Sequence, residues 1–235
     1  MSNESQNQSF VEVARYSGKG YDLERLRTLQ ERIATKVVIE DRFKKPIKRV
    51  AGFDVTYLDG EAIAAAVTMD HGTLRVVEEK TTKGKVPFPY IPTFLGFREG
   101  PLIIRLAKNL KLEPDVIMVN SHGIAHPLFC GCASHVGVSL GKATIGVAGS
   151  KLCGEYEGKP EKVGDWVSLK HRERIVGAVL LSKPSSRPIF VSVGHMVTLK
   201  TAVEIVKYFL TMHKFPEPVR LAHKLANRTK KEAST

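Results

Sequence analysis

Apolar residues recur along this chain at helical and strand spacings, and these patterns predict its first elements. A helical face lies within residues 22–39, with Asp22 as the expected N-cap, and it comprises Leu23, Leu26, Leu29 and Ile33. Three β-type runs then follow one another, separated by the turn signals DG at 59–60 and HG at 71–72: RVAGFDVTYL, EAIAAAVTMD and TLRVVEEKTT. Short strands joined by tight turns favour an antiparallel meander.

The second half of the pattern alternates between strands and helices. The proline-rich stretch VPFPYIP (86–92) predicts a loop, and FLGFREGPLIIRLAKNL predicts a helix with an irregularity at Gly100-Pro101. A strand is expected around 115–119, a helix in GCASHVGVSL and a strand in ATIGVAG (143–149). Three further β-like runs precede two amphipathic helices, in the order DWVSLK, RIVGAVLLS, RPIFVSVG, KTAVEIVKYFLTMH and PEPVRLAHKLANRTKK. The proline that opens the last segment suits a helix start.

This order of elements predicts an α/β fold. A meander followed by strand–helix–strand crossovers indicates one mixed sheet flanked by helices on both faces. The polar residues 1–20 are expected to form a disordered N-terminal lead, and residues 21–235 to form a single domain.

Charge adds a class of partner to this picture. Lys and Arg number 36 against 24 Asp and Glu, which gives a formal net charge of +12. Such an excess favours nucleic acid, because neutralised phosphates release counterions; the alternative is a mildly basic protein with no such partner. No apolar run reaches about 18 residues, so no membrane partner is expected. Three cysteines without a signal-peptide pattern suggest reduced thiols and a cytoplasmic location.

Three polar positions within or beside apolar runs are candidates for chemistry. Asp54 interrupts the strand GFDVTY, so it is either a solvated residue on an edge strand or a buried carboxylate that binds a metal. Glu99, in FREGP, is either a surface ion pair with Arg98 or a second metal ligand. Asn120 ends the strand VIMV. Oxygen ligands gathered from separate elements can bind Mg²⁺ and support phosphodiester cleavage.

Two histidines and one loop are further candidates. His126 and His223 could act on a substrate, although a histidine in RLAHKL can equally be a structural or surface residue. The prolines of PYIP stiffen a loop that would present Tyr90 and Ile91. Such a tip could enter a base stack, and the alternative is a proline-rich loop packed on the surface.

Taken in order, these stretches resemble the endonuclease V family. The resemblance rests on AGFDVTY, FPYIPTFLGFREGPL, HGIAHP, GCASHVGV, TIGVA, PIFVSVGH and PEPVRLAH, and it runs from about residue 22 to residue 228. It implies a ribonuclease H-like fold and cleavage that depends on Mg²⁺, for which Mn²⁺ is expected to substitute. It also implies DNA or RNA containing inosine as the partner, cut at the second phosphodiester 3′ to the lesion, with 3′-hydroxyl and 5′-phosphate ends. We expect a monomer.

The resemblance assigns roles to matching positions of this chain. The implied metal ligands are Asp54, Glu99 and Asn120. The implied catalytic set adds two histidines, His126 and His223. The implied strand-separating wedge is Pro89, Tyr90, Ile91 and Pro92. The implied pocket for the base, where glycine allows a close backbone approach, is formed by Leu95, Ser121, Gly123 and Gly131.

Several of these positions depart from the family pattern. Asn120-Ser121 stands where Asp-Gly is usual, Leu128 follows HGIAHP where Arg is usual, and Gly149 replaces a lysine, for which Lys151 is a candidate substitute. An amide cannot offer a charge to offset Mg²⁺. The first hypothesis is therefore an active inosine-directed endonuclease with a modified metal site. The alternative is a nucleic-acid-binding protein with weak or no cleavage, and a third reading is a nuclease for another nucleic-acid structure.

Overall fold

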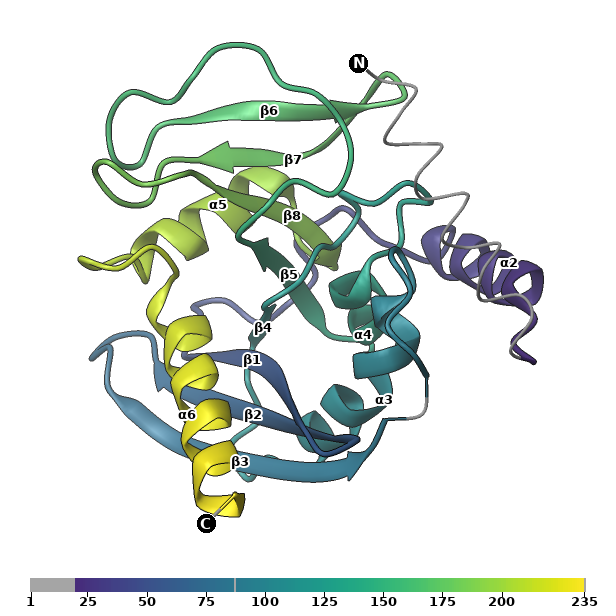
Figure 1. Ribbon diagram of the computed structural model, residues 1–235. Coiled ribbons are helices and arrows are strands. Elements are labelled where there is room, and N and C mark those ends of the chain that lie inside the picture. Colours follow the sequence, from purple (N-terminus) through teal and green to yellow (C-terminus); the bar gives the residue numbers. More distant parts are fainter. Residues whose placement is uncertain (1–19, 87, 235) are drawn as a thin grey trace.

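The computed structural model describes residues 20–86 and 88–234, which form one mixed sheet with helices around it (Figure 1). The expected disordered lead lies outside the described residues except for Gly20. The strands are β1 (Arg49–Leu58), β2 (Glu61–Asp70), β3 (Val76–Lys85), β4 (Val116–Val119), β5 (Ala143–Ala148), β6 (Trp166–His171), β7 (Arg174–Leu180) and β8 (Ile189–His195). The helices in the described residues are α2 (Leu23–Ala34), α3 (Leu95–Lys108), α4 (Cys132–Leu140), α5 (Leu199–Tyr208) and α6 (Glu217–Ala233).

The sheet places β1 in its interior, and this position decides the environment of the candidate site. The strand order is β3-β2-β1-β4-β5-β8-β7-β6, so the predicted meander forms one side of the sheet. β1, β4 and β5 run parallel to one another, whereas the other neighbouring strands are antiparallel. Since carboxyl ends of parallel strands meet at one edge of a sheet, residues that follow β4 and β5 lie near each other.

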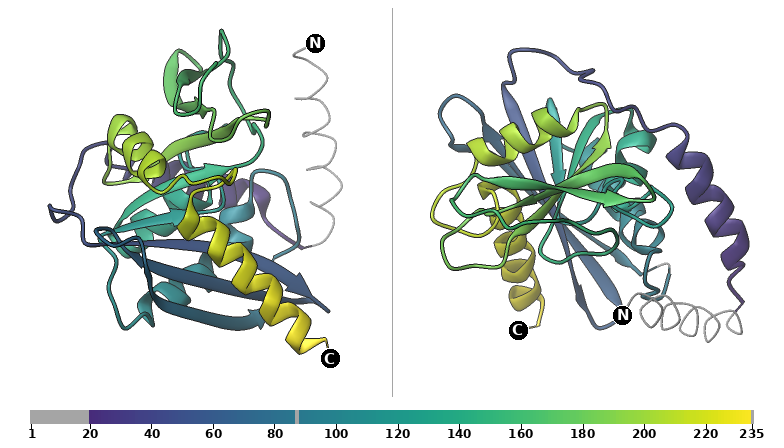
Figure 2. Two further views of the ribbon diagram at one scale, coloured as in Figure 1. Left: turned by 90° about the vertical axis from the view of Figure 1, so that its left-hand side faces the viewer. Right: turned by 90° about the horizontal axis from the view of Figure 1, so that it is seen from above.

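Helices cover both faces of the sheet, as the sequence predicts, and Figure 2 (right) shows the sheet between them. On one face, α3 and α4 bury Ile103 and Val136 against alternate residues of the central strands, Phe53 among them. On the other face, α5 and α6 bury Val203 and Ala222 against a larger cluster that extends over β5, β7 and β8. Two faces of one strand therefore belong to two different cores, which requires apolar residues on both faces of β1.

Two helix boundaries differ from the prediction. The first helix ends at Ala34 and not near residue 39. The β-branched residues Val37 to Ile39 follow it, and such residues lose side-chain freedom in a helix. The helix α3 continues unbroken through Pro101, where an irregularity was expected. Burial of Leu102 and Ile103 against the sheet offsets the hydrogen bond that the proline cannot donate.

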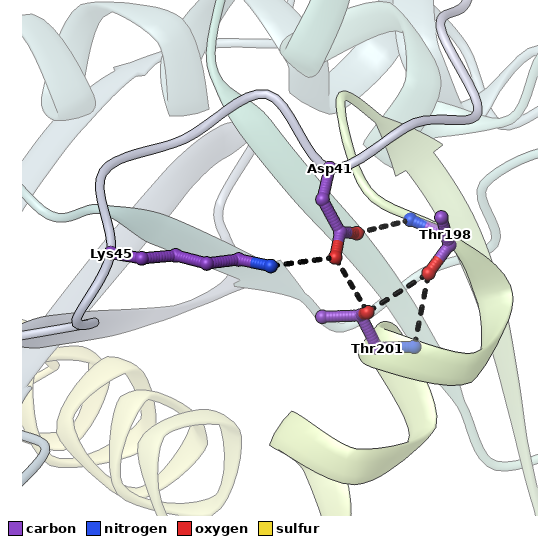
Figure 3. A network of polar contacts seen from close by, with 4 residues as sticks. All are labelled: Asp41, Lys45, Thr198 and Thr201. Atoms are coloured by element: carbon purple, nitrogen blue, oxygen red, sulfur yellow. Dashed lines mark hydrogen bonds and ion pairs between the residues drawn. The ribbon is translucent and has the colours of Figure 1, made fainter.

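The basic linker between α2 and β1 is tied to α5 by one carboxylate (Figure 3). Asp41 accepts a hydrogen bond from the Thr198 backbone N–H at 2.8 Å through Oδ1 and one from the Thr201 hydroxyl at 2.7 Å through Oδ2. Lys45 Nζ lies 3.2 Å from the same Oδ2 atom. Thr198 is itself the N-cap of α5. The linker therefore supports the first turn of this helix.

All three cysteines are free, and Cys130 and Cys132 are buried, as expected for packing thiols. Within the described part of the chain, no helix combines the length and the apolar character that crossing a membrane requires.

Candidate active site

Asp54 lies at the centre of a group of hydrogen bonds on β1. Its side chain is buried, with 7% of the residue exposed, and β1 pairs with β2 on one side and β4 on the other, so the edge-strand alternative is wrong. Oδ1 accepts a hydrogen bond from Asn120 Nδ2 at 2.8 Å, and Oδ2 lies 2.6 Å from His223 Nδ1. A buried carboxylate therefore contacts two of the residues that the sequence singles out.

The strand register explains how Asn120 reaches Asp54. Phe53 pairs with Val119 in the parallel ladder, so the next residues of both strands lie level and side by side. The Asn120 backbone N–H also donates to the Phe53 carbonyl at 3.0 Å, which extends the ladder by one hydrogen bond. The position of Asn120 is thus set by the backbone, and a change of its side chain alters the chemistry without moving the residue.

Glu99 approaches from α3 and is buried, with 8% of the residue exposed, so it is not half of a surface ion pair. Its Oε1 atom accepts a 2.6 Å hydrogen bond from the Tyr57 hydroxyl. The Arg98 guanidinium lies 4.3 Å from the centre of the Tyr57 ring and donates to the Phe88 carbonyl at 2.6 Å. Burial raises the pKa of Glu99 to about 7, the Tyr57 hydrogen bond opposes this shift, and the charge of Asp54 adds to it.

His223 extends the network along α6. Its Nε2 atom lies 3.0 Å from Asn227 Nδ2, and Asn227 Oδ1 accepts a hydrogen bond from the Thr56 hydroxyl at 3.4 Å. An amide nitrogen can only donate, so Nε2 accepts and the ring carries its proton on Nδ1, which faces Asp54. The side chain of His223 is 60% exposed and remains accessible to a substrate.

Basic residues continue from His223 along the same helix. An open groove on the surface of α6 is lined by His223, Lys224, Asn227, Arg228, Lys231 and Glu232. Arg228 pairs with Glu79 of β3 at 3.0 Å. The excess of positive charge beside the carboxylates fits the backbone of a nucleic acid.

His126 occupies a different environment from His223. It is buried, Nε2 lies 2.8 Å from the Thr93 carbonyl oxygen, and Nδ1 accepts a hydrogen bond from the Leu128 backbone N–H at 3.1 Å. Burial lowers the pKa of His126 to about 4, although the bond to Thr93 acts in the opposite direction. The ring is therefore neutral and donates from Nε2. A catalytic role stays a prediction, since these contacts favour a role in holding the loop.

The loop with the expected wedge presents one side chain and buries the next. Tyr90 is 63% exposed, whereas Ile91 is 1% exposed and belongs to a cluster with Phe88, Phe94 and Leu23. The expectation that Ile91 forms part of an exposed tip is wrong, because the loop needs an apolar anchor against α2 and α3. Pro89 and Pro92 are half-buried on either side. The tip of the loop is Tyr90.

Thr93 fixes the end of this loop in an unfavourable backbone conformation. Its φ of 72° lies in the left-handed region, which a β-branched residue rarely adopts. Its carbonyl accepts hydrogen bonds from Gln30 Nε2 at 2.7 Å and from His126 Nε2 at 2.8 Å. Gln30 is itself buried in α2. Two buried donors thus hold the loop against the rest of the fold.

The donor chemistry of the site fits a divalent cation. Among the residues that the structure describes, no three His, Cys, Asp or Glu side chains form a ready ligand group. The site instead offers two carboxylates, close enough that the charge of Asp54 raises the pKa of Glu99. It also offers the amide of Asn120, which donates to Asp54 Oδ1. Mg²⁺ is commonly bound through one or two carboxylates together with phosphate oxygens and water.

Comparison with known proteins identifies the family. The family model described as Endonuclease V matches residues 31–224. The chain belongs to the endonuclease V family. A relative named Endonuclease V, from Roseiflexus castenholzii, is 40% identical over 207 residues, which are 88% of this chain and 93% of that protein.

Solved structures of the family match the same fold. Endonuclease V from Streptomyces avermitilis superposes with a TM-score of 0.84 at 37% identity, over 90% of this chain and 94% of that one. Endonuclease V from Ciona intestinalis, in complex with a 24mer DNA containing an inosine followed by a ribo-adenosine, gives a TM-score of 0.76 at 29% identity, over 90% and 98%. The predicted ribonuclease H-like α/β fold is thereby confirmed.

The residues that the endonuclease V resemblance assigns to the base pocket lie in tightly packed backbone. A Cβ atom on Gly123 would come within 2.0 Å of the Val193 carbonyl oxygen, and one on Gly131 within 2.3 Å of the His122 carbonyl oxygen. Ser121 is buried, and Leu95 is half-buried at the start of α3. The close approach of backbones explains both glycines, and contact of these residues with a base stays a prediction.

Sequence reasoning missed two supporting residues. Tyr57 holds Glu99, and Asn227 holds His223. Tyr57 and Asn227 lie on elements that the sequence had already placed at the site. Asn227 follows His223 by four residues on a helix, a spacing that puts the two side chains on one face. That spacing was a usable signal; Tyr57 offered none, because its partner lies 42 residues away.

Proposed function

We propose that this member of the endonuclease V family is a Mg²⁺-dependent endonuclease that cleaves DNA or RNA at the second phosphodiester 3′ to an inosine. The observation that carries the proposal is the buried pair of carboxylates, Asp54 and Glu99, beside the exposed His223. The complex of the Ciona intestinalis protein with inosine-containing DNA supports the choice of substrate.

Each residue of the site contributes a distinct part. Asp54 and Glu99 would hold Mg²⁺ with the amide of Asn120, and the bound cation would supply Lewis-acid chemistry for activating water and stabilising the leaving oxygen. Tyr57 orients Glu99 by its 2.6 Å hydrogen bond. His223, held through Nδ1 by Asp54, would orient the attacking water or the phosphate with its exposed ring. Tyr90 would enter the base stack beside the lesion.

A specific observation favours the second candidate, an inosine-binding protein with weak cleavage. Both oxygens of Asp54 already accept hydrogen bonds, and it is the nitrogen of Asn120 that faces Asp54. Metal binding would require the amide to turn over and present its oxygen. The family resemblance also implies that Leu128 and Gly149 stand where polar residues are usual, which would reduce the number of polar groups near the phosphate.

A cleavage assay separates the two functions. Purified protein is incubated with Mg²⁺ or Mn²⁺ and with duplex DNA, single-stranded DNA and RNA that each contain one inosine. We expect one cut at the second phosphodiester 3′ to inosine, with a 5′-phosphate, and none with Asp54→Ala. Binding without cleavage above the Asp54→Ala level would leave only the binding function.

A further inference from the structure

Three neighbouring strands present Asp54, Asn120 and Gly149 on one face of the sheet. Phe53 pairs with Val119 and Val119 with Gly146, so Asp54, Asn120 and Val147 lie level on β1, β4 and β5. Side chains alternate along a strand, and Met118 and Val147 both belong to the core beneath α5 and α6. Asn120 and Gly149, each two residues further along, therefore face the same side, which is also the side of His223.

A lysine from a distant part of the chain occupies the space beside Gly149. Lys214, in the loop between α5 and α6, donates from Nζ to the Gly149 carbonyl at 3.3 Å. A Cβ atom on Gly149 would lie 3.1 Å from Phe215 Cζ and 3.8 Å from Lys214 Nζ. A side chain at position 149 would thus press on the Phe215 ring and meet the Lys214 ammonium at ordinary contact distance.

The position of this ammonium group is supported by the fold. Ser182, which is fully buried, donates a 2.5 Å hydrogen bond from its hydroxyl to the Lys214 carbonyl. The Lys214 ammonium also lies 5.8 Å from the centre of the Phe215 ring, within the range of a cation–π contact. Lys214 is half-buried, whereas Lys151, the expected substitute for the family lysine, is exposed in the loop after β5.

The separation between Asp54 and Gly149 lets one nucleic-acid strand contact both positions. Two strand spacings of about 4.8 Å and two residue rises of about 3.3 Å separate the Cα atoms of Asp54 and Gly149 by about 12 Å. The ammonium has three N–H donors, and the Gly149 carbonyl can take only one of them. A strand that crosses the carboxyl ends of β4 and β5 would meet the carboxylates and then this cation.

We propose that Lys214 binds a phosphate of the substrate strand next to the bond that is cut, in place of a basic residue at position 149. This proposal rests on the proposed function, which identifies the bound strand as the inosine-containing substrate. Lysine suits this task as a compact charge that can donate to phosphate oxygens. Lys214 approaches from the loop before α6 rather than from β5, and its ammonium group reaches the Gly149 carbonyl.

The test compares Lys214→Met with Lys200→Met, which removes the same charge from an exposed position on α5. Binding of a fluorescent single strand with one inosine is measured by anisotropy in EDTA at several salt concentrations, and cleavage is measured separately with Mg²⁺. Loss of one phosphate contact should reduce the slope of log K against log salt by about 0.7. We expect Lys214→Met to bind about fivefold to tenfold more weakly and to lose cleavage efficiency by at least that factor, and Lys214→Arg to retain the slope.

The outcomes separate this proposal from the proposed function. A slope for Lys214→Met equal to that of the wild type and of Lys200→Met, with cleavage unchanged, would overturn the role of Lys214 alone. Absence of inosine-directed cleavage by the wild type, with binding that still depends on Lys214, would overturn the proposed function alone. If Lys214→Met lowers the unfolding temperature, the slopes are compared below it, and an equal loss of slope in Lys214→Arg would also contradict the proposal.

Discussion

Replacing Asn120 by aspartate tests the metal site most directly. In the structure the amide donates a 2.8 Å hydrogen bond to the buried Asp54 carboxylate. Asn120→Asp removes that bond, which contributes about 1.5–3 kcal/mol when the acceptor is charged. It also brings two carboxylates together, and like charges about 4 Å apart near a protein surface repel by about 4 kcal/mol. Protonation of one carboxyl relieves part of this repulsion, so we expect the metal-free variant to lose about 2–4 kcal/mol of unfolding free energy.

Thermal unfolding in EDTA and in Mg²⁺ measures both halves of this effect. For a domain of this size, 1 kcal/mol corresponds to a shift of about 2–4 °C in Tm. We therefore expect Asn120→Asp to unfold about 5–15 °C below the wild type in EDTA. Mg²⁺ should recover most of that loss, because a cation between three carboxylates offsets their repulsion and stabilises the folded state by mass action. The wild type should respond less to Mg²⁺.

A neutral substitution separates the charge from the lost hydrogen bond. Asn120→Ala removes the amide without adding a carboxylate, so it should lose less stability in EDTA and gain no enhanced response to Mg²⁺. The reasoning fails if Asn120→Asp unfolds at the wild-type temperature in EDTA. It also fails if Mg²⁺ stabilises Asn120→Asp no more than it stabilises Asn120→Ala.

Three further predictions concern the scaffold. A Cβ atom on Gly52 would lie 2.1 Å from the backbone at the start of α6. Gly52→Ala should therefore lower the free energy of unfolding by about 1–3 kcal/mol and, by shifting the helix that carries His223, reduce the cleavage rate about 100-fold. Gly72→Ala, whose Cβ meets only a side-chain atom at 3.6 Å, is the neutral control in thermal unfolding and cleavage assays. Gln30→Leu removes the hydrogen bond from α2 to the carbonyl of Thr93, which ends the loop. It should slow cleavage of duplex more than of single-stranded inosine substrates, since only the duplex requires strand separation. An equal loss of cleavage rate on both substrates would contradict this. Burial raises the pKa of Asp41, but its hydrogen bonds to Thr198, Thr201 and Lys45 outweigh burial, so the pKa is lowered from 3.8. The wild type should therefore exceed Asp41→Asn in unfolding free energy by about 1 kcal/mol above that pH and lose this advantage as the pH falls below 3.8. Urea titrations at several pH values would measure the difference.

The strand pattern made most of the fold predictable. Three β-type runs joined by the turn signals at 59–60 and 71–72 indicated the meander. The helix boundaries were less predictable because tertiary packing competes with local preference: α3 continues through Pro101 on the strength of its buried face. The pattern could not show which of two adjacent residues, Tyr90 or Ile91, points outward, because a loop has no fixed period.

The site divides in a similar way. Asp54 was predictable because an acidic residue in an apolar run needs a reason to be there, whereas Glu99, between Arg98 and Gly100, was assigned to the site by the family resemblance. Asn227 could have been found from its helical spacing to His223, whereas Lys214 could not. Its partner Gly149 lies 65 residues away, and a contact between two loops so far apart in the sequence is visible only in three dimensions.

The charge balance of the site gives Asn120 and Lys214 a common consequence. Asp54 and Glu99 contribute two negative charges, so a bound Mg²⁺ would leave the site neutral, and Lys214 would then balance the single charge of a phosphodiester. A third carboxylate at position 120 would hold the cation more tightly but would leave one net negative charge facing the phosphate. We therefore expect Asn120→Asp to lower the Mg²⁺ concentration needed for half-maximal cleavage and to raise KM for the nucleic acid. Titrations of metal and of substrate with both proteins would measure the two effects, and a fall in both quantities together would contradict this account of the site.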